Sequence, residues 1–584
     1  MKVQEKLSTP LFDGIFAPQV VAVPPTFACS DLCRAADGEI RHYGWQMVGG
    51  VRRRVFIASR DEGLSWKTCL AADGEAGAME KSPESGDWIG FALDGGLFVL
   101  RSKTGPGDPA PERTRIPWKG DFVRQFVHLR SRPRWIATLS DTSCEGVAGY
   151  RAAVALSDDD GRTWRRVQVP PVPGVARTLP GDMRPRWFCD GCEPTVVEHA
   201  DGTLRLCVRT SGPHHAFFFS RDGGETWGEG RPDPAFWATN TMPYFLRLSD
   251  GRLLFFWNNT APLPTRDAAE TPELSEAELS GKWEAVFTNR DALHAAISDD
   301  DGKTWLGFRE IALNDIRNAS DFRELGNEPG QEFDKSVHQT QALELRGGKV
   351  LLAYGQNVAA RRLAVFDPDW LLETGREDDF HAGLGGISNH LYVRSLSGAW
   401  RGWAGHCAWN RMPGATLVRD PSTDAPSPDG KRSFREVLQL ARMDDPRLVS
   451  GRQGVVWNFP AMRSGAVAVE CRIAGAGFRL SLSDHWMNPC DETNPALGPF
   501  SAKITKAELP GGAWHTLTAE WDEDAGTVTL SDDGRHIAVH PLASRPPFGL
   551  SYLHLQTLAD GPDPEGTYIR RLAANTFTKE QNNE

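Results

Sequence analysis

Four short stretches of the chain carry hydroxyl and carboxylate side chains at a spacing that could bind a metal ion. SRDEGLSW begins at Ser59, SDDDGRTW at Ser157, SRDGGETW at Ser220 and SDDDGKTW at Ser298. The EF-hand calcium loop needs oxygen ligands at alternate positions and a Glu at the twelfth, and none of the four boxes provides that set. The boxes are therefore predicted to be turns between strands. In such a turn Ser and Asp bond to nearby N–H groups, Gly supplies a positive φ, and Trp packs back as an anchor.

A second pattern with metal or redox spacing is CDGC, which runs from Cys189 to Cys192. A lone pair of this kind is weak evidence for zinc or redox work, and the other cysteines are scattered. Because a chain of 584 residues does not need disulfide staples, we expect reduced thiols. The sequence predicts neither a metal site nor a cofactor.

Charge and hydropathy exclude several classes of partner. The formal net charge of -12 argues against a nucleic-acid binder, which needs a basic face, so an anionic ligand must be held by a local cluster of Arg or Lys. No segment approaches the roughly 20 apolar residues of a membrane span, and the N-terminus lacks the apolar core of a signal peptide. We expect a cytoplasmic protein, or a secreted or periplasmic one if a signal was removed. The oligomeric state is not predicted.

The elements that must position any site are short strands. Hydrophobic segments flank tight turns in EHADGTLRLCVRT (198–210), RLSDGRLLFFWNN (247–259) and ELRGGKVLLAYGQ (344–356). Such hairpins, at a period of roughly 40–80 residues, predict radial repetition, as in a β-propeller. We therefore expect an all-β chain with a propeller of about six blades over residues 1–410. A linker rich in Pro, Asp, Ser and Gly follows at 411–432, and a β-sandwich at 433–584.

The four boxes with interleaved hairpins resemble the sialidase superfamily, whose catalytic domain is a six-bladed propeller. The resemblance covers about residues 15–405, and the C-terminal part looks like a laminin-G or concanavalin-like (jelly-roll) sandwich. It implies an exo-glycoside hydrolase that holds a substrate carboxylate with three Arg. In this family a Tyr activated by a Glu attacks, and an Asp acts as acid and base. The box is specific for the architecture, not for the reaction.

Part of the family's site matches this chain. Glu193 in CEPTVVE resembles the Glu partner, while Arg209 and Arg290 resemble the second and third Arg; guanidinium groups pair bidentately with carboxylates. The region before the first hairpin, FACSDLCRAADGEI, has neither the family's first Arg nor a convincing acid. Arg361 is a candidate replacement for that Arg, and Asp190 is a candidate acid.

The expected nucleophile is absent. In KSVHQTQALELRGG, Gln339 occupies the place of the Tyr, and Gln is not a nucleophile. His338 beside it is a candidate general acid or base near neutral pH, although it could equally be a His bonded to a neighbouring strand. Lys335 and Gln339 flank it and are candidate substrate-binding residues.

Three functional hypotheses follow. The first is a sialidase-like hydrolase acting on an acidic oligosaccharide or polysaccharide, without the tyrosyl nucleophile; an inverting reaction needs none. The second is a lyase acting on a uronate, with His338 as the base. The third is a glycan-binding propeller without catalysis. We expect the hydrolase first. Trp486, in the long loop 484–499, is a further candidate for contact with sugar.

Overall fold

The structure is a computed structural model that describes thirteen segments of the chain and one further residue. They are residues 10–25, 32–118, 123–141, 151–173, 191–210, 212–239, 241–261, 290–314, 336–356, 360–393, 410–423, 435–446, 448 and 450–576. Strands dominate these segments; α1 (Pro10–Asp13), η1 (Pro368–Leu372), η2 (Pro421–Thr423) and η3 (Asn494–Leu497) are each five residues or shorter. No helix in the described segments is long and apolar enough to cross a membrane.

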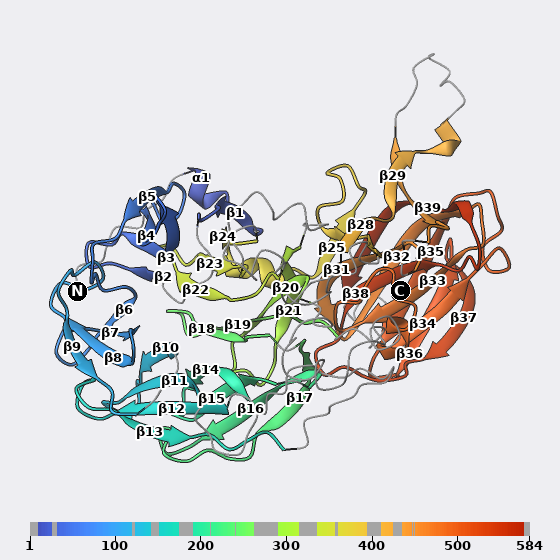
Figure 1. Ribbon diagram of the computed structural model, residues 1–584. Helices are drawn as coiled ribbons and strands as arrows, with labels where there is room; N and C mark the ends of the chain where they lie inside the picture. The colour runs from blue at the N-terminus through green and yellow to red at the C-terminus, as the bar shows by residue number, and fades with distance from the viewer. Residues whose placement is uncertain are drawn as a thin grey trace.

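Six four-stranded antiparallel sheets in the described part of the chain form a ring (Figure 1), which confirms the predicted propeller. Blade 1 contains β2 (Leu32–Arg34), β3 (Ile40–Val48), β4 (Val51–Ser59) and β5 (Lys67–Leu70); blade 2 contains β6 (Met79–Lys81), β7 (Trp88–Leu93), β8 (Leu97–Ser102) and β9 (Glu112–Arg115); blade 3 contains β10 (Val123–His128), β11 (Trp135–Asp141), β12 (Arg151–Ser157) and β13 (Arg165–Gln168). Blade 4 contains β14 (Cys192–Glu198), β15 (Leu204–Arg209), β16 (His214–Ser220) and β17 (Arg231–Trp237); blade 5 contains β18 (Tyr244–Arg247), β19 (Leu253–Trp257), β20 (Ala292–Ser298) and β21 (Leu306–Leu313).

Blade 6 closes the ring with strands from both ends of the propeller. It contains β22 (Gln341–Glu344), β23 (Val350–Tyr354) and β24 (Arg362–Phe366), and β1 (Gln19–Ala22) completes it by pairing antiparallel with β24. In each blade the first strand lies innermost, except that β1 is the outermost strand of blade 6. The six inner strands therefore start at one end of the ring, and residues placed there meet across the centre.

The four boxes are turns between the third and fourth strands of blades 1, 3, 4 and 5. In the second box, Asp159 accepts hydrogen bonds from the Ser157 hydroxyl at 2.8 Å and the Thr163 hydroxyl at 2.6 Å, and the Gly161 N–H donates to Ser157. The Trp164 indole donates back to the Gly161 carbonyl at 3.0 Å. All these oxygens take part in hydrogen bonds within the turn, which confirms the prediction that the boxes are turns between strands.

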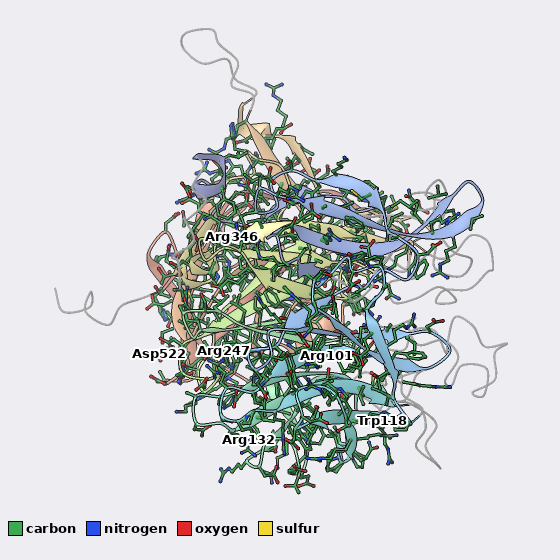
Figure 2. All side chains as sticks on the ribbon, turned by 90° about the vertical axis from the view of Figure 1, so that its left-hand side faces the viewer. Arg101, Trp118, Arg132, Arg247, Arg346 and Asp522 are labelled. Atoms are coloured by element: carbon green, nitrogen blue, oxygen red, sulfur yellow. The ribbon has the colours of Figure 1, made fainter. Side chains whose placement is uncertain are left out.

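The fourth residue of three boxes has a second role that the sequence analysis did not predict; in the third box this position is Gly223. Glu62, Asp160 and Asp301 adopt φ values of 56°, 56° and 60°, and their carboxylates pair with arginines. Asp160 of blade 3 binds Arg101 of blade 2 at 2.6 Å, and Asp301 binds Arg247 at 2.6 Å. Figure 2 labels Arg101 and Arg247 among these arginines. Glu62 of blade 1 lies 3.7 Å from Arg346 of blade 6, so the first and second boxes also join blades.

Two further sheets pack face to face as a β-sandwich, with one core that contains Trp457, Phe459 and Trp521. The larger sheet contains β25 (Gly375–Asp378), β29 (Thr416–Arg419), β30 (Glu436–Arg442), β32 (Ser464–Ile473), β35 (His515–Asp522), β36 (Thr527–Asp532), β37 (Arg535–Pro541) and β39 (Asp563–Thr576). The smaller contains β26 (Ile387–Ser388), β31 (Gly454–Met462), β33 (Phe478–Ser483), β34 (Phe500–Ile504) and β38 (Leu550–Thr557); β27 (His390–Val393) pairs with β28 (Asn410–Pro413).

The change from propeller to sandwich comes earlier in the chain than the expected linker. β25 pairs with β39 and β26 with β31, although both lie within the range 1–410 expected for the propeller. Part of the expected linker 411–432 is itself strand, because β29 pairs with β30. The reason is that the sandwich takes edge strands from the segment that leaves blade 6, which no change in composition marks.

Polar and aromatic contacts join the sandwich to blades 4 and 5. The Trp237 ring stacks on His485 with centroids 4.0 Å apart, and the Tyr552 hydroxyl donates to Glu310 at 2.7 Å. Trp486, expected as an exposed sugar-binding aromatic, is fully buried here, and its indole donates to Ser388 at 2.9 Å. That expectation is wrong, because the loop carrying Trp486 packs against the side of the ring.

Candidate functional site

The starts of the inner strands of blades 3, 4 and 6 bring three polar side chains together. Arg124 on β10 donates to the Gln339 side-chain oxygen at 2.9 Å and to one oxygen of Glu193 on β14. The other Glu193 oxygen accepts from Arg209, at the end of β15, at 2.6 Å. Glu193 therefore bridges two guanidinium groups, and its side chain is buried.

Arg290 and His338 form the next part of the site. Arg290 directly precedes β20 and is fully buried, and its Nη1 lies 3.2 Å from Nε2 of His338. A backbone bond of 3.0 Å from Val337 N–H to the Arg290 carbonyl holds blades 5 and 6 together at this point. The loop before β22 thus places His338 against Arg290.

Arg361 completes the group from the segment before β24. Its Nη1 donates to the Gln339 carbonyl at 2.8 Å, and its Nη2 lies 2.7 Å from Nε2 of His42, on β3 of blade 1. Arg361 and His42 are both fully buried. The adjacent Arg362 is half-buried and its guanidinium bonds back to the Arg361 carbonyl, so only Arg361 of this pair belongs to the group. We call Arg124, Arg209, Arg290 and Arg361 the central arginines.

Burial and charge act on the titratable groups in consistent directions. Burial alone would raise the pKa of Glu193, but the charges of Arg124 and Arg209 lower it to about 2. Burial, reinforced by the charges of all four central arginines, lowers the pKa of His338 well below its usual value. Near neutral pH, Glu193 is therefore a carboxylate and His338 a neutral imidazole. Among the described residues, the printed bonds bring four guanidinium groups and the carboxylate of Glu193 together.

Two site residues have a backbone conformation that L-residues rarely adopt. Glu193 has φ +43° and Gln339 has φ +57°. Each such residue costs of order 1–3 kcal/mol and persists only where surrounding contacts fix it. Here the Glu193 N–H donates to the Ser140 hydroxyl at 2.9 Å, and the Gln339 carbonyl accepts from Arg361. Strain of this kind is concentrated at functional sites.

The structure brings six of the predicted site residues together: Glu193, Arg209, Arg290, His338, Gln339 and Arg361. Asp190 and Lys335 lie outside the described residues, as does Cys189 of the CDGC pattern; Cys192 is buried at the start of β14. The sequence analysis missed Arg124 and His42. The signal for Arg124 was its place at the start of an inner strand, as for Glu193.

Tyr43 is a tyrosine with a carboxylate partner close to this region. Its hydroxyl donates to Glu75 at 2.6 Å, a contact that resembles an activated tyrosyl nucleophile. Burial, reinforced by the Glu75 bond, raises the pKa of Tyr43 far above its usual value, and the residue has no exposed surface. A phenol that stays protonated and buried is poorly placed to attack a substrate.

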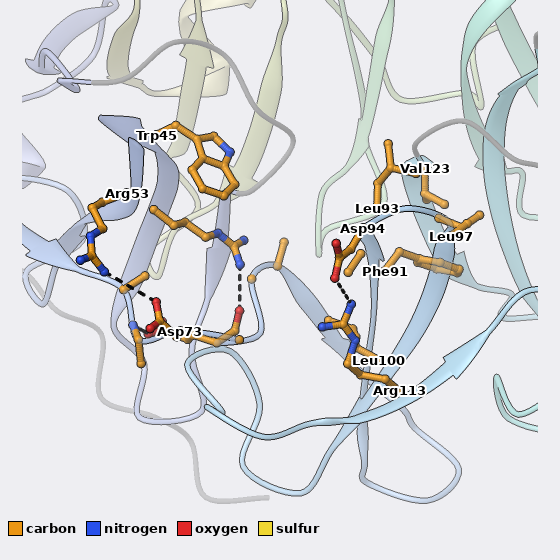
Figure 3. A pocket seen from close by; sticks show the side chains of 18 of the residues that line it. Trp45, Arg53, Asp73, Phe91, Leu93, Asp94, Leu97, Leu100, Arg113 and Val123 are labelled. Carbon is orange, nitrogen blue, oxygen red and sulfur yellow. Dashed lines mark hydrogen bonds and ion pairs between the residues drawn. The ribbon is translucent and has the colours of Figure 1, made fainter. Parts of the chain in front are cut away.

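A cavity of about 900 Å³ opens beside the central arginines, between blades 1 and 2. Arg124, Gln339 and Gln356 line it together with Trp45 and Arg52. Figure 3 shows Trp45 on one wall and Phe91, Leu93 and Asp94 on the opposite wall. This volume is at the upper end of the roughly 300–1,000 Å³ typical of ligand sites.

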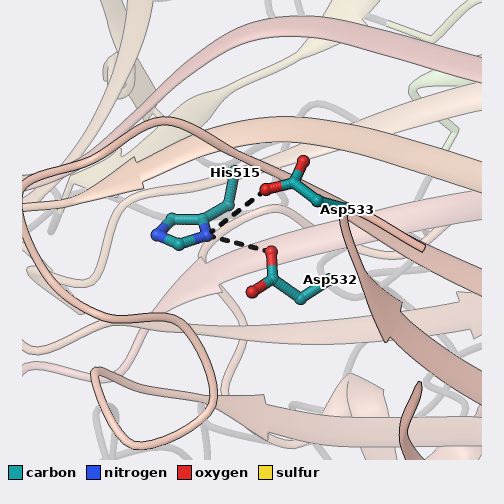
Figure 4. Close-up of side chains that lie close together, drawn as sticks. All are labelled: His515, Asp532 and Asp533. Carbon is teal, nitrogen blue, oxygen red and sulfur yellow. Dashed lines mark hydrogen bonds and ion pairs between the residues drawn. The ribbon is translucent and has the colours of Figure 1, made fainter. Parts of the chain in front are cut away.

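A group with metal-ligand chemistry lies in the sandwich, remote in sequence from this site. His515, Asp532 and Asp533 lie close together (Figure 4), with His515 Nδ1 2.9 Å from Asp532. The other ring nitrogen, Nε2, lies 2.9 Å from the Pro510 carbonyl, and Asp533 accepts from the Thr516 N–H at 3.0 Å. The protein itself uses both imidazole nitrogens, so the group is described by these bonds without a metal.

Comparisons with known proteins find one family and several solved structures. Residues 111–320 match a family described as "BNR repeat-like domain", which agrees with the repeated boxes of the propeller. No curated protein matches the sequence. A Dyadobacter fermentans protein of unknown function is similar in structure at 15% identity, over 60% of this chain and 97% of that one, with a TM-score of 0.35. Trypanosoma rangeli sialidase in complex with sialic acid is similar at 12% identity, over 95% of this chain and 92% of that one, with a TM-score of 0.32. The laminin-G likeness of the sandwich stays a prediction.

Proposed function

We propose that this protein is a carbohydrate-active enzyme that hydrolyses a glycan at a carboxylate-bearing sugar. The observation that carries the proposal is the convergence of four guanidinium groups around Glu193, His338 and Gln339 at the centre of the ring. A cluster of guanidinium groups is a cationic site of the kind that binds anions. Planar guanidinium groups bind a planar carboxylate bidentately, so an acidic sugar is the ligand class that fits.

Each residue has a role in this proposal. Arg124, which lines the cavity, binds the substrate carboxylate, and the buried Arg209, Arg290 and Arg361 contribute to the same positive field. Arg124 and Arg209 also hold Glu193 ionised. Gln339 donates hydrogen bonds from its amide and replaces the tyrosine that the family uses. Without a protein nucleophile, a water molecule attacks the anomeric carbon directly, and the reaction proceeds with inversion. The residue that protonates the leaving oxygen is not assigned among the described residues, and Asp190 stays the candidate from the sequence.

His338 has a more restricted role than the sequence suggested. A group that is neutral at physiological pH has no proton to give as a general acid, and its Nε2 faces the Arg290 guanidinium. We assign it to positioning Arg290. The same unprotonated state is what a base in a β-elimination needs, so a lyase acting on a uronate is the second candidate.

The test is an incubation of the purified protein with sialylated oligosaccharides and with oligogalacturonates, followed by mass spectrometry. Hydrolysis gives products heavier by one water, whereas elimination leaves the total mass unchanged and creates a double bond that absorbs ultraviolet light. Arg209→Gln and Arg290→Gln are expected to lose at least 100-fold in affinity or turnover, because truncating one member of a buried charge network costs about 2–5 kcal/mol.

Arg231→Gln is the matched control, since Arg231 lies on β17 of the same blade as Arg209 but its side chain is 83% exposed. Circular dichroism checks that each variant folds. Binding without turnover would leave a glycan-binding propeller. Full activity in folded Arg209→Gln and Arg290→Gln would overturn the assignment of the site.

A further inference from the structure

The hairpin of β3 and β4 in blade 1 extends beyond the strands that flank it. β2 pairs with β3 only over residues 40–42, and β5 pairs with β4 only over 55–58, whereas β3 and β4 pair with each other out to Val48 and Val51. Within the described residues, the outer part of this hairpin is therefore a two-stranded arm. Several of its side chains, Trp45 and Arg52 among them, are exposed.

One face of this arm alternates aromatic rings with guanidinium groups. Residues directly opposite on paired strands share a face, and the register places Tyr43 and Trp45 on the same face as Arg54 and Arg52. The Arg54 guanidinium lies 4.7 Å from the Tyr43 ring centroid, and that of Arg52 lies 5.1 Å from the Trp45 centroid. Trp45 is 39% exposed although it is one of the largest apolar side chains. The contacts hold an indole face and a cation next to each other at the cavity wall.

The cavity connects this face to the central arginines. Arg124 and Gln339 of the central group line the same cavity as Trp45 and Arg52 of the arm. Among the described residues, five arginines and three acidic residues line it: Arg52, Arg53, Arg54, Arg113 and Arg124 against Asp73, Glu75 and Asp94. In a chain with net charge -12, this local reversal of sign favours an anionic ligand. The volume of about 900 Å³ accommodates more than one sugar ring.

We propose that this cavity is a second sugar subsite that binds the residues of an acidic oligosaccharide next to the one held by the central arginines. The indole face of Trp45 packs on the C–H face of a pyranose ring, and Arg52 binds an acidic group on that ring. The substrate is then a chain with acidic groups on successive residues, not a neutral glycan with a single acidic end. This inference rests on the proposed function and narrows its substrate class.

The experiment compares chain lengths. Calorimetry measures the affinity of the full-length protein for dimers and tetramers of α-linked sialic acid and of galacturonate. Wild type is expected to bind the tetramer of the preferred sugar at least ten-fold more tightly than the dimer. Trp45→Ala and Arg52→Gln are expected to reduce this tetramer-to-dimer ratio to about one. Arg60→Gln, directly after β4 and with a side chain 68% exposed at the other end of the strand from Arg52, is expected to keep it.

The outcomes separate the two proposals. If both lengths bind equally well and Arg290→Gln weakens both, the central site stands and the second subsite is wrong. If Trp45→Ala weakens both lengths by the same factor, Trp45 belongs to the first subsite and the inference fails. If no acidic oligosaccharide binds, both proposals fail. If light scattering shows a dimer that Trp45→Ala dissociates, the arm is a self-association surface and the inference is overturned.

Discussion

Arginines at the edges between blades and arginines at the centre of the ring differ in how they contact carboxylates. At the edges, Arg101 bonds to Asp87 at 2.8 Å and Asp160 at 2.6 Å, and Arg134 bonds to Asp158 at 2.6 Å and Glu225 at 2.8 Å. Each of these arginines contacts two carboxylates. At the centre, Arg124 and Arg209 both bond to the carboxylate of Glu193.

The pKa values express the same difference. Burial alone would lower the pKa of Arg101 and Arg134, but their carboxylate partners raise both above the usual value. Burial lowers the pKa of Arg124, and the single carboxylate of Glu193 does not offset it, while Arg209 lowers it further. The carboxylate partners thus raise the pKa of the arginines at the blade edges, whereas burial and the neighbouring Arg209 lower the pKa of Arg124 at the centre.

The largest expected effect is a loss of stability when an arginine at the edge between two blades is replaced. Arg101→Gln leaves Asp160 buried without its cation, so we expect the free energy of unfolding to fall by about 3 kcal/mol, the lower end for a broken buried pair because Lys103 still pairs with Asp87. Urea unfolding measures this. Arg165→Gln, with a side chain 44% exposed, is the matched control and should cost at most about 1 kcal/mol. Equal losses for the two variants would remove the distinction between paired and surface arginines.

The second-largest expected effect is the pH dependence of the stability that Glu193 contributes at the centre of the ring. Because the folded-state pKa of Glu193 is about 2 and the ordinary value is 4.5, its ionised form stabilises the protein fully above pH 4.5, and this contribution is lost as the pH falls toward 2. The shift corresponds to about 3 kcal/mol. The difference in unfolding free energy between wild type and Glu193→Gln should therefore shrink by about this amount from pH 5 to pH 2. A difference independent of pH would show that Glu193 is not held by the arginines.

An anion should stabilise the centre and not the edges. A ligand at 100 times its Kd adds about 2.7 kcal/mol to the unfolding free energy. We expect sialic acid or glucuronic acid to stabilise wild type and Arg101→Gln by similar amounts and to have no effect on Arg290→Gln, whereas neutral galactose should stabilise none of them. Denaturant midpoints with and without each sugar measure this. Stabilisation of Arg290→Gln by the acids would place the anion elsewhere.

Much of the fold could be predicted because it depends on local chemistry. The hairpins carry turn residues at fixed offsets from apolar strands, and the Ser, Asp, Gly and Trp of each box indicate a propeller blade. Glu193, Arg209 and Arg290 were found because each has a fixed place relative to a hairpin or a box. The resemblance was needed to select them from other strand-end residues.

The rest depends on contacts between distant segments, which a local pattern does not carry. Arg124 and His42 belong to the site because blades 1 and 3 face the centre, yet neither lies in a motif. The early start of the sandwich depends on pairing of β25 with β39, about 190 residues later. Trp486 reads as a candidate for contact with sugar, and only the packing of the sandwich on blades 4 and 5 shows that it is buried.

The smallest expected effect compares two adjacent residues of one box. Asp159 is exposed and holds only the turn, so Asp159→Ala should cost about 1 kcal/mol, the value of a typical net hydrogen-bond contribution. Asp160 is buried and joins Arg101, Ser82 and Trp135, so Asp160→Ala should cost clearly more. Neither calcium nor a chelator should change the unfolding midpoint of wild type or Asp159→Ala, because the turn itself uses the Asp159 oxygens. A calcium-dependent rise of the unfolding midpoint that Asp159→Ala abolishes would show that the box binds a metal ion. The boxes would then be ligand sites, as the centre of the ring is proposed to be.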